Sequence, residues 1–110
     1  MASSTKQLIT STQKIVLNST TEVIDSFPFT SWTGVVEYTL IFETTIGARL
    51  KTLKLVAEKK GVGVEDQIYN RAGSVITLQV TAQVTGLNFE LAITNNDIVP
   101  IKVTLIRIKQ

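Results

Sequence analysis

The side chains that most often carry out catalysis are missing from this sequence. Its 110 residues include no histidine and no cysteine, which removes the commonest general base, the commonest metal ligands and every Ser-His or Cys-His nucleophile arrangement. Carboxylates remain, and Glu65-Asp66 is the only adjacent acidic pair. Neighbours on a strand point to opposite faces, so this pair cannot act jointly as a catalytic dyad.

The other acidic residues and the glycines have structural explanations. Asp25 and Asp97 stand beside turn signals, where a carboxylate caps the local backbone. The segment Gly61-Val62-Gly63 lacks both the following Lys-Ser/Thr and the helix of a phosphate-binding loop. We therefore expect no catalytic residue, no bound cofactor and no metal site, and we predict that the protein is not an enzyme.

Charge and hydropathy argue against nucleic-acid and membrane partners. The net charge is +2, and the basic residues are dispersed, whereas nucleic-acid binding needs clustered cations to displace counterions. No apolar run approaches the roughly 20 residues of a membrane span. The first six residues also lack the apolar stretch of a signal peptide. We expect a soluble protein that is made in the cytoplasm.

Alternating apolar and polar residues predict an all-β protein. The clearest alternation lies in residues 35–44 and 76–84, where apolar side chains share one face, and apolar residues nowhere recur at helical spacing. The expected strands cover about residues 14–17, 22–27, 35–44, 53–57, 64–69, 76–84, 89–93 and 101–108. Seven to eight short strands with turn signals between them predict an antiparallel β-sandwich of jelly-roll or immunoglobulin-like type.

The first residues of the chain differ from the rest. Residues 1–13 are rich in Ser and Thr and weakly patterned, so we expect an extended N-terminal arm there and the β-sandwich domain in residues 14–110. Ordering an arm costs backbone entropy, which must be offset by burial of Leu8, Ile9 and Ile15 or by strand pairing on a neighbouring subunit. Deletion of residues 1–13 is then expected to leave a folded domain that no longer assembles.

The loop Phe27–Trp32 holds the densest group of aromatic residues. Two interpretations of Trp32 stay open, a plug at the end of the hydrophobic core and an anchor at a subunit contact, where Trp and Phe are enriched. A third is a carbohydrate-stacking platform formed by Trp32 with Phe29. An exposed Trp32 in the isolated chain would favour the platform, and a buried Trp32 would favour the core plug.

Several short motifs follow one another in a specific order. They are Ile24-Asp25-Ser26-Phe27, Val35-Val36-Glu37-Tyr38-Thr39-Leu40, Leu53-Lys54-Leu55-Val56-Ala57, Tyr69 before a turn, Ile76-Thr77-Leu78-Gln79-Val80-Thr81, and Val103-Thr104-Leu105-Ile106-Arg107. This order resembles a small β-sandwich domain that recurs in structural proteins of tailed bacteriophages, notably cyanophages. The resemblance covers about residues 23–109 and rests on strand pattern rather than on a catalytic signature.

The resemblance implies a virion structural protein that is present in many copies and assembled in the host cytoplasm. We expect a capsid decoration or cement protein, with a tail, neck or baseplate component as the alternative. The implied partners are major capsid or tail proteins and further copies of this chain, and analogy with decoration proteins favours a trimer. A carbohydrate- or receptor-binding sandwich is the other class that fits the sequence.

Overall fold

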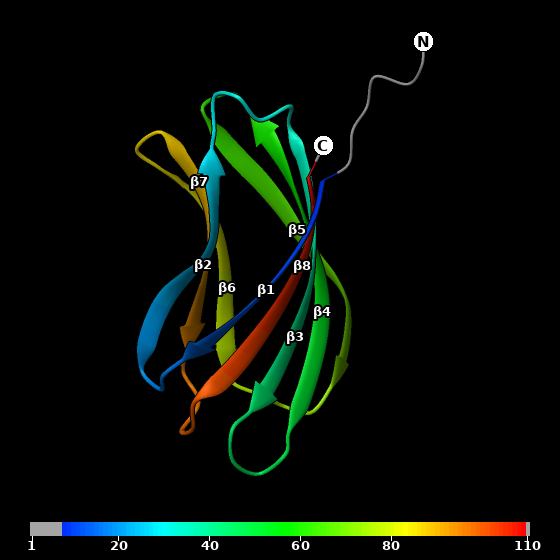
Figure 1. Ribbon diagram of the computed structural model, residues 1–110, viewed down its shortest axis with the longest axis vertical. Coiled ribbons are helices and arrows are strands. Elements are labelled where there is room, and N and C mark those ends of the chain that lie inside the picture. The colour runs from blue at the N-terminus through cyan, green and yellow to red at the C-terminus, as the bar shows by residue number, and fades with distance from the viewer. Residues whose placement is uncertain (1–7, 110) are drawn as a thin grey trace.

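Two antiparallel β-sheets pack face to face in this protein (Figure 1). The structure is a computed structural model that describes residues 8–109, and this part of the chain contains strands and no helix. Its strands are β1 (Leu8–Val16), β2 (Thr20–Pro28), β3 (Val35–Thr44), β4 (Leu50–Lys60), β5 (Gly63–Gly73), β6 (Leu78–Thr85), β7 (Asn88–Asn95) and β8 (Ile101–Lys109). The predicted all-β antiparallel sandwich is confirmed.

The larger sheet has five strands in the order β1-β8-β3-β4-β5, and the smaller sheet has three in the order β2-β7-β6. Hairpins join β3 to β4, β4 to β5 and β6 to β7. By contrast, β1 and β2 follow each other in the chain but belong to different sheets. Within the described residues, no helix is long and apolar enough to cross a membrane.

The core lies between β3 and its neighbours on one side and β7 on the other. Every second residue of β3 is buried, as the alternation predicted. In the facing sheet, Phe89, Leu91 and Ile93 of β7 are fully buried. The rings of Tyr38 and Phe89 stack across the two layers with their centroids 6.4 Å apart. Alternation on two facing strands therefore brings the two apolar faces together.

The second half of the chain departs from the prediction at two places. The expected turn at residues 70–73 belongs to β5, which continues to Gly73 through a bulge at Asn70, whose φ is 53°. Strand β6 begins at Leu78 rather than at Ile76, and Ile76 is buried in the β5–β6 loop. The apolar face of β6 is half-buried, not buried, because β6 is the last strand of its sheet.

The residues predicted to form an arm are placed differently. Leu8–Gln13 form the first six residues of β1 and pair in register with β8 of the same chain, from Leu8 opposite Lys109 to Gln13 opposite Thr104. The boundary drawn between residues 13 and 14 thus falls inside a strand. Most described side chains of β1 are exposed, so backbone pairing holds the strand. Because few of its side chains are buried, its sequence shows little alternation of apolar and polar residues. Residues 1–7, the rest of the predicted arm, lie outside the described residues.

Candidate functional site

The loops β1–β2, β3–β4, β5–β6 and β7–β8 gather at one end of the sandwich, the lower end in Figure 1. Five large aliphatic side chains on or beside these loops are between 47% and 86% exposed. We call this set the aliphatic loop end; it consists of Leu17, Ile46, Leu50, Val75 and Ile98. Exposed aliphatic side chains that gather on one face are typical of surfaces that bind other proteins.

An ion pair inside this end joins two of the loops. Arg49 donates to both carboxylate oxygens of Asp97, at 2.7 Å and 3.1 Å. Asp97 is only 8% exposed and also accepts the backbone N–H groups of Thr77 and Ile98, at 3.0 Å and 2.8 Å. The hydrogen bond from Arg49, followed by that from Thr77, holds the pKa of the Asp97 carboxyl well below its usual range. Asp97 therefore caps the backbone, as its sequence context predicted.

The same network fixes the backbone beside the exposed aliphatic residues. Arg49 Nη1 donates to the carbonyl oxygen of Val75 at 3.0 Å, while the N–H of Ile98 donates to Asp97. The guanidinium and carboxylate thus bind main-chain atoms of the two most exposed members of the loop end. Because both loops are already fixed, a molecule that bound there would order little additional backbone.

Asn95 adds a fourth loop, β1–β2, to this frame. Its buried Nδ2 donates to the carbonyl oxygens of Val16 and Val99, at 3.0 Å and 2.9 Å, and its Oδ1 accepts the N–H of Asp97 at 2.8 Å. Val16 precedes Leu17, so the β1–β2 connection is tied to the β7–β8 loop through one amide side chain. A buried amide side chain that makes three hydrogen bonds in this way fixes a single loop arrangement.

A second polar cluster lies between the sheets, far from the loop end along the strands. Arg107 Nη1 on β8 donates to both carboxylate oxygens of Asp25 on β2 at 3.1 Å, and its Nη2 donates to Thr10 Oγ1 at 3.3 Å. The Tyr38 hydroxyl donates to Asp25 at 2.6 Å. Burial, followed by the Asp25 charge, raises the Tyr38 pKa far above its usual value. Asp25 does not cap a turn, because a bulge between Val23 and Asp25 turns its side chain toward Arg107.

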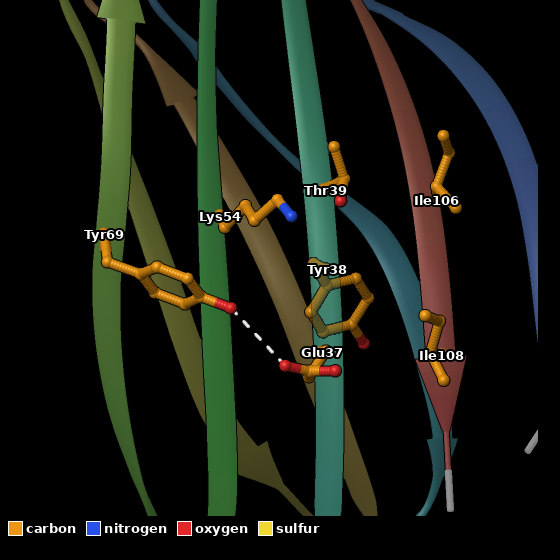
Figure 2. A pocket seen from close by; sticks show the side chains of 7 residues that line it. All are labelled: Glu37, Tyr38, Thr39, Lys54, Tyr69, Ile106 and Ile108. Carbon is orange, nitrogen blue, oxygen red and sulfur yellow. Dashed lines mark hydrogen bonds between the residues drawn. The ribbon is translucent and has the colours of Figure 1, made fainter.

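The outer face of the five-stranded sheet carries a small hollow (Figure 2). Tyr69 on β5 reaches across β4, and its hydroxyl donates to Glu37 Oε1 on β3 at 3.4 Å, with Ile106 and Ile108 beyond on β8. Burial, followed by the charge of Glu37, raises the Tyr69 pKa. The hollow measures about 60 Å³, whereas small-molecule pockets usually enclose roughly 300–1,000 Å³. The hollow is therefore smaller than a usual small-molecule pocket.

Trp32 lies in the hydrophobic core at the opposite end from the aliphatic loop end. It is 3% exposed, its ring meets Phe27 and Phe89 with centroids 5.3 Å away in each case, and its Nε1 donates to the carbonyl oxygen of Val35 at 3.1 Å. Phe29 is half-buried beneath Lys59, whose Nζ lies 4.6 Å from the ring centroid. A buried indole presents no face on which a sugar could stack.

The remaining residues singled out from the sequence lie on β1. Ile9 and Ile15 are 70% and 47% exposed, and they share the outer face of the strand, while Leu8 pairs through its backbone with Lys109. Leu8 and Ile9 therefore lie at the far end of β1 from the aliphatic loop end, whereas Ile15 lies one residue before the end of β1 that enters it. Sequence reasoning missed the loop end, although one signal was available: Ile46 and Ile98 are aliphatic residues directly beside turn-forming Gly47 and Asp97.

Metal-binding side chains are not clustered among the described residues. In residues 8–109, no three His, Cys, Asp or Glu side chains are grouped so that they could hold a metal ion. The carboxylates of Asp25 and Asp97 are each neutralised by an arginine. No model of a known protein family matches the chain, and no curated protein matches its sequence. The fold is that of a β-sandwich, and its loops expose aliphatic side chains at one end.

Proposed function

We propose that this protein is a structural subunit of a larger assembly and that the aliphatic loop end is its main binding surface. The observation that carries the proposal is that exposed aliphatic side chains stand on loops joined by the Arg49–Asp97 ion pair, whose carboxylate is buried. Burying apolar surface contributes about 25 cal/mol per Å². Fixed loops retain more of this free energy on binding than mobile loops do.

The assembly we propose is the virion of a tailed bacteriophage. The support is the order of strand motifs over residues 23–109, which resembles small sandwich domains of phage structural proteins. Within the virion, we propose a capsid decoration or cement role, with contacts to major capsid protein and to further copies of this chain. A tail, neck or baseplate position uses the same surface chemistry and is the alternative.

Purified particles of the phage that encodes the chain provide the test. We expect the chain to co-purify with particles on a density gradient in many copies, as measured by mass spectrometry. Absence of the chain from such particles contradicts the virion proposal.

A pair of matched variants tests the binding surface. Ile98→Asp places a charge at the loop end, and Val62→Asp places the same charge on the β4–β5 turn, where Val62 is 91% exposed. We expect Ile98→Asp to lower incorporation into particles at least tenfold and Val62→Asp to leave it unchanged, with both chains folded by circular dichroism. Equal incorporation of the two variants argues against the loop end as the contact.

A further inference from the structure

Strand β6 has a free edge without the features that usually protect one. Its eight residues, Leu78–Thr85, carry no charged side chain and no proline, and within residues 8–109 its one strand partner is β7. Alternate N–H and C=O groups along its other side therefore have no strand to pair with. Natural edge strands are usually blunted by charges, prolines or bulges.

The other three edges of the sandwich carry such features. Strand β5 has a bulge at Asn70 and the charged residues Glu65, Asp66 and Arg71. Strand β2 has a bulge after Val23 and ends in proline, and β1 contains a lysine. The edge of β6 is therefore the one that remains suited to pairing.

Beside this edge the sandwich is open. The inner face of β4 is buried at Leu55, but Ile68, which pairs with Leu55, is only half-buried on β5. Across from it, Leu78 and Val80 of β6 are also half-buried. A hollow of about 200 Å³ separates these side chains. We call this hollow the lateral groove; Lys51, Leu53, Ile68, Arg71, Leu78, Gln79 and Val80 line it.

The groove lies between the edge strands of the two sheets, with β6 on one side and β5 on the other. A strand added to β6 would lie about 4.8 Å from it, over the half-buried inner face of β5. The β6 strand of a second copy would offer no carboxylate to Lys51 and Arg71, because β6 carries no charged side chain.

The basic side chains along the groove indicate which charge an occupant should carry. Lys51 and Arg71 line it beside Leu78, at the beginning of β6. Asp66 stands further along β5, opposite Ala57 of β4. An incoming strand gains from a carboxylate near the basic pair and from aliphatic side chains at alternate positions, facing Ile68 and Val80.

We propose that β6 accepts a single extended segment of a partner protein, about eight residues long, with alternating aliphatic and polar side chains and an acidic residue beside Lys51 and Arg71. Main-chain hydrogen bonds to β6 supply affinity, and the groove selects the alternate side chains. Antiparallel pairing, the slightly more stable arrangement, places the acidic residue at the C-terminal end of the segment. This site is separate from the aliphatic loop end and does not depend on the proposed function.

The probe is a synthetic peptide of alternating Thr and Val that ends in Asp, titrated against the full-length chain by fluorescence anisotropy. Its matched analogue carries N-methyl groups on alternate residues, which removes backbone donors and keeps the side chains. A third peptide ends in Lys instead of Asp. We expect saturable binding of the first peptide, at least tenfold weaker binding of the N-methylated analogue, and several-fold weaker binding of the Lys peptide.

The protein variants are Val80→Lys, which places a charge in the groove, and Val62→Lys, which places one on the distant β4–β5 turn. We expect Val80→Lys to lower peptide affinity at least tenfold and Val62→Lys and Ile98→Asp to leave it unchanged. Failure of the unmodified peptide to bind at millimolar concentration overturns the proposal, as does equal binding by Val80→Lys or by the N-methylated peptide. A wild-type dimer in sedimentation that Val80→Lys abolishes also overturns it, because the edge then belongs to a second copy.

Discussion

Arg49 and Asp97, which are 48 residues apart in the sequence, join the β3–β4 and β7–β8 loops through two hydrogen bonds to one carboxylate. The same guanidinium binds the carbonyl oxygen of Val75 in the β5–β6 loop. One ion pair thus joins three loops at one end of the sandwich, and it binds main-chain atoms of Val75 and Ile98, the two most exposed aliphatic residues of that end.

Removing this carboxylate is expected to destabilise the fold and loosen the loop end. In Asp97→Ala, the Arg49 guanidinium and the N–H groups of Thr77 and Ile98 lose their acceptor, and a buried group left unpaired is costly. We expect Tm to fall by several degrees. Glu65→Ala is the control, because Glu65 pairs with Lys60 on the exposed surface, where an ion pair contributes little. Equal Tm values for the two variants contradict this role for Asp97.

The same carboxylate is expected to make stability depend on acid pH. The folded-state pKa of Asp97 is depressed, so its contribution is fully present above the unfolded value of about 4 and is lost as pH falls toward the folded value. Urea unfolding of the wild type should therefore show a steeper loss of stability below about pH 4 than unfolding of Asp97→Ala. The gap between the two proteins should narrow from pH 6 to pH 3. A constant gap contradicts the assignment.

The hydroxyl of Tyr38 is expected to stabilise the contact between the sheets. Tyr38 is buried and donates to Asp25 at 2.6 Å, and a hydrogen bond to a charged acceptor is worth about 1.5–3 kcal/mol. Tyr38→Phe should lower the free energy of unfolding by about that amount in urea titration. Tyr69→Phe is the matched control, since its hydroxyl makes a longer bond of 3.4 Å on the outer face. We expect a clearly smaller change there, and the reverse order would count against the inter-sheet role.

Two deletions are expected to differ because of β1. Removal of residues 1–7 keeps all nine residues of β1, whereas removal of residues 1–13 deletes six of them and frees the edge of β8. We expect the longer deletion to lower Tm by roughly 5–10 °C relative to the shorter one, the shift produced by about 1–2 kcal/mol in a domain of this size. Differential scanning fluorimetry measures it. Equal Tm values would show that β1 adds nothing to the fold.

The alternation of apolar residues allowed much of the fold to be predicted. In β3 and β7, every second side chain is buried, because a strand with one covered face needs a period of two. The prediction of burial was less accurate for the edge strand β6, whose apolar face is only partly covered. Leu78 and Val80 alternate as well as any pair in the chain, yet they are half-buried because β6 has no neighbour on one side. Position in a sheet is not encoded by periodicity.

The composition and order of residues in this chain determined its β class, the inward faces of its central strands and the places where most of its turns fall, since these depend on neighbours in the sequence. Tertiary structure decided which strands pair and which charges meet. The pairing of Leu8–Gln13 with β8 and the contact of Asp25 with Arg107, 82 residues away, both join distant segments. Such contacts depend on strand pairing and on the packing of the two sheets, so no local sequence pattern predicts them.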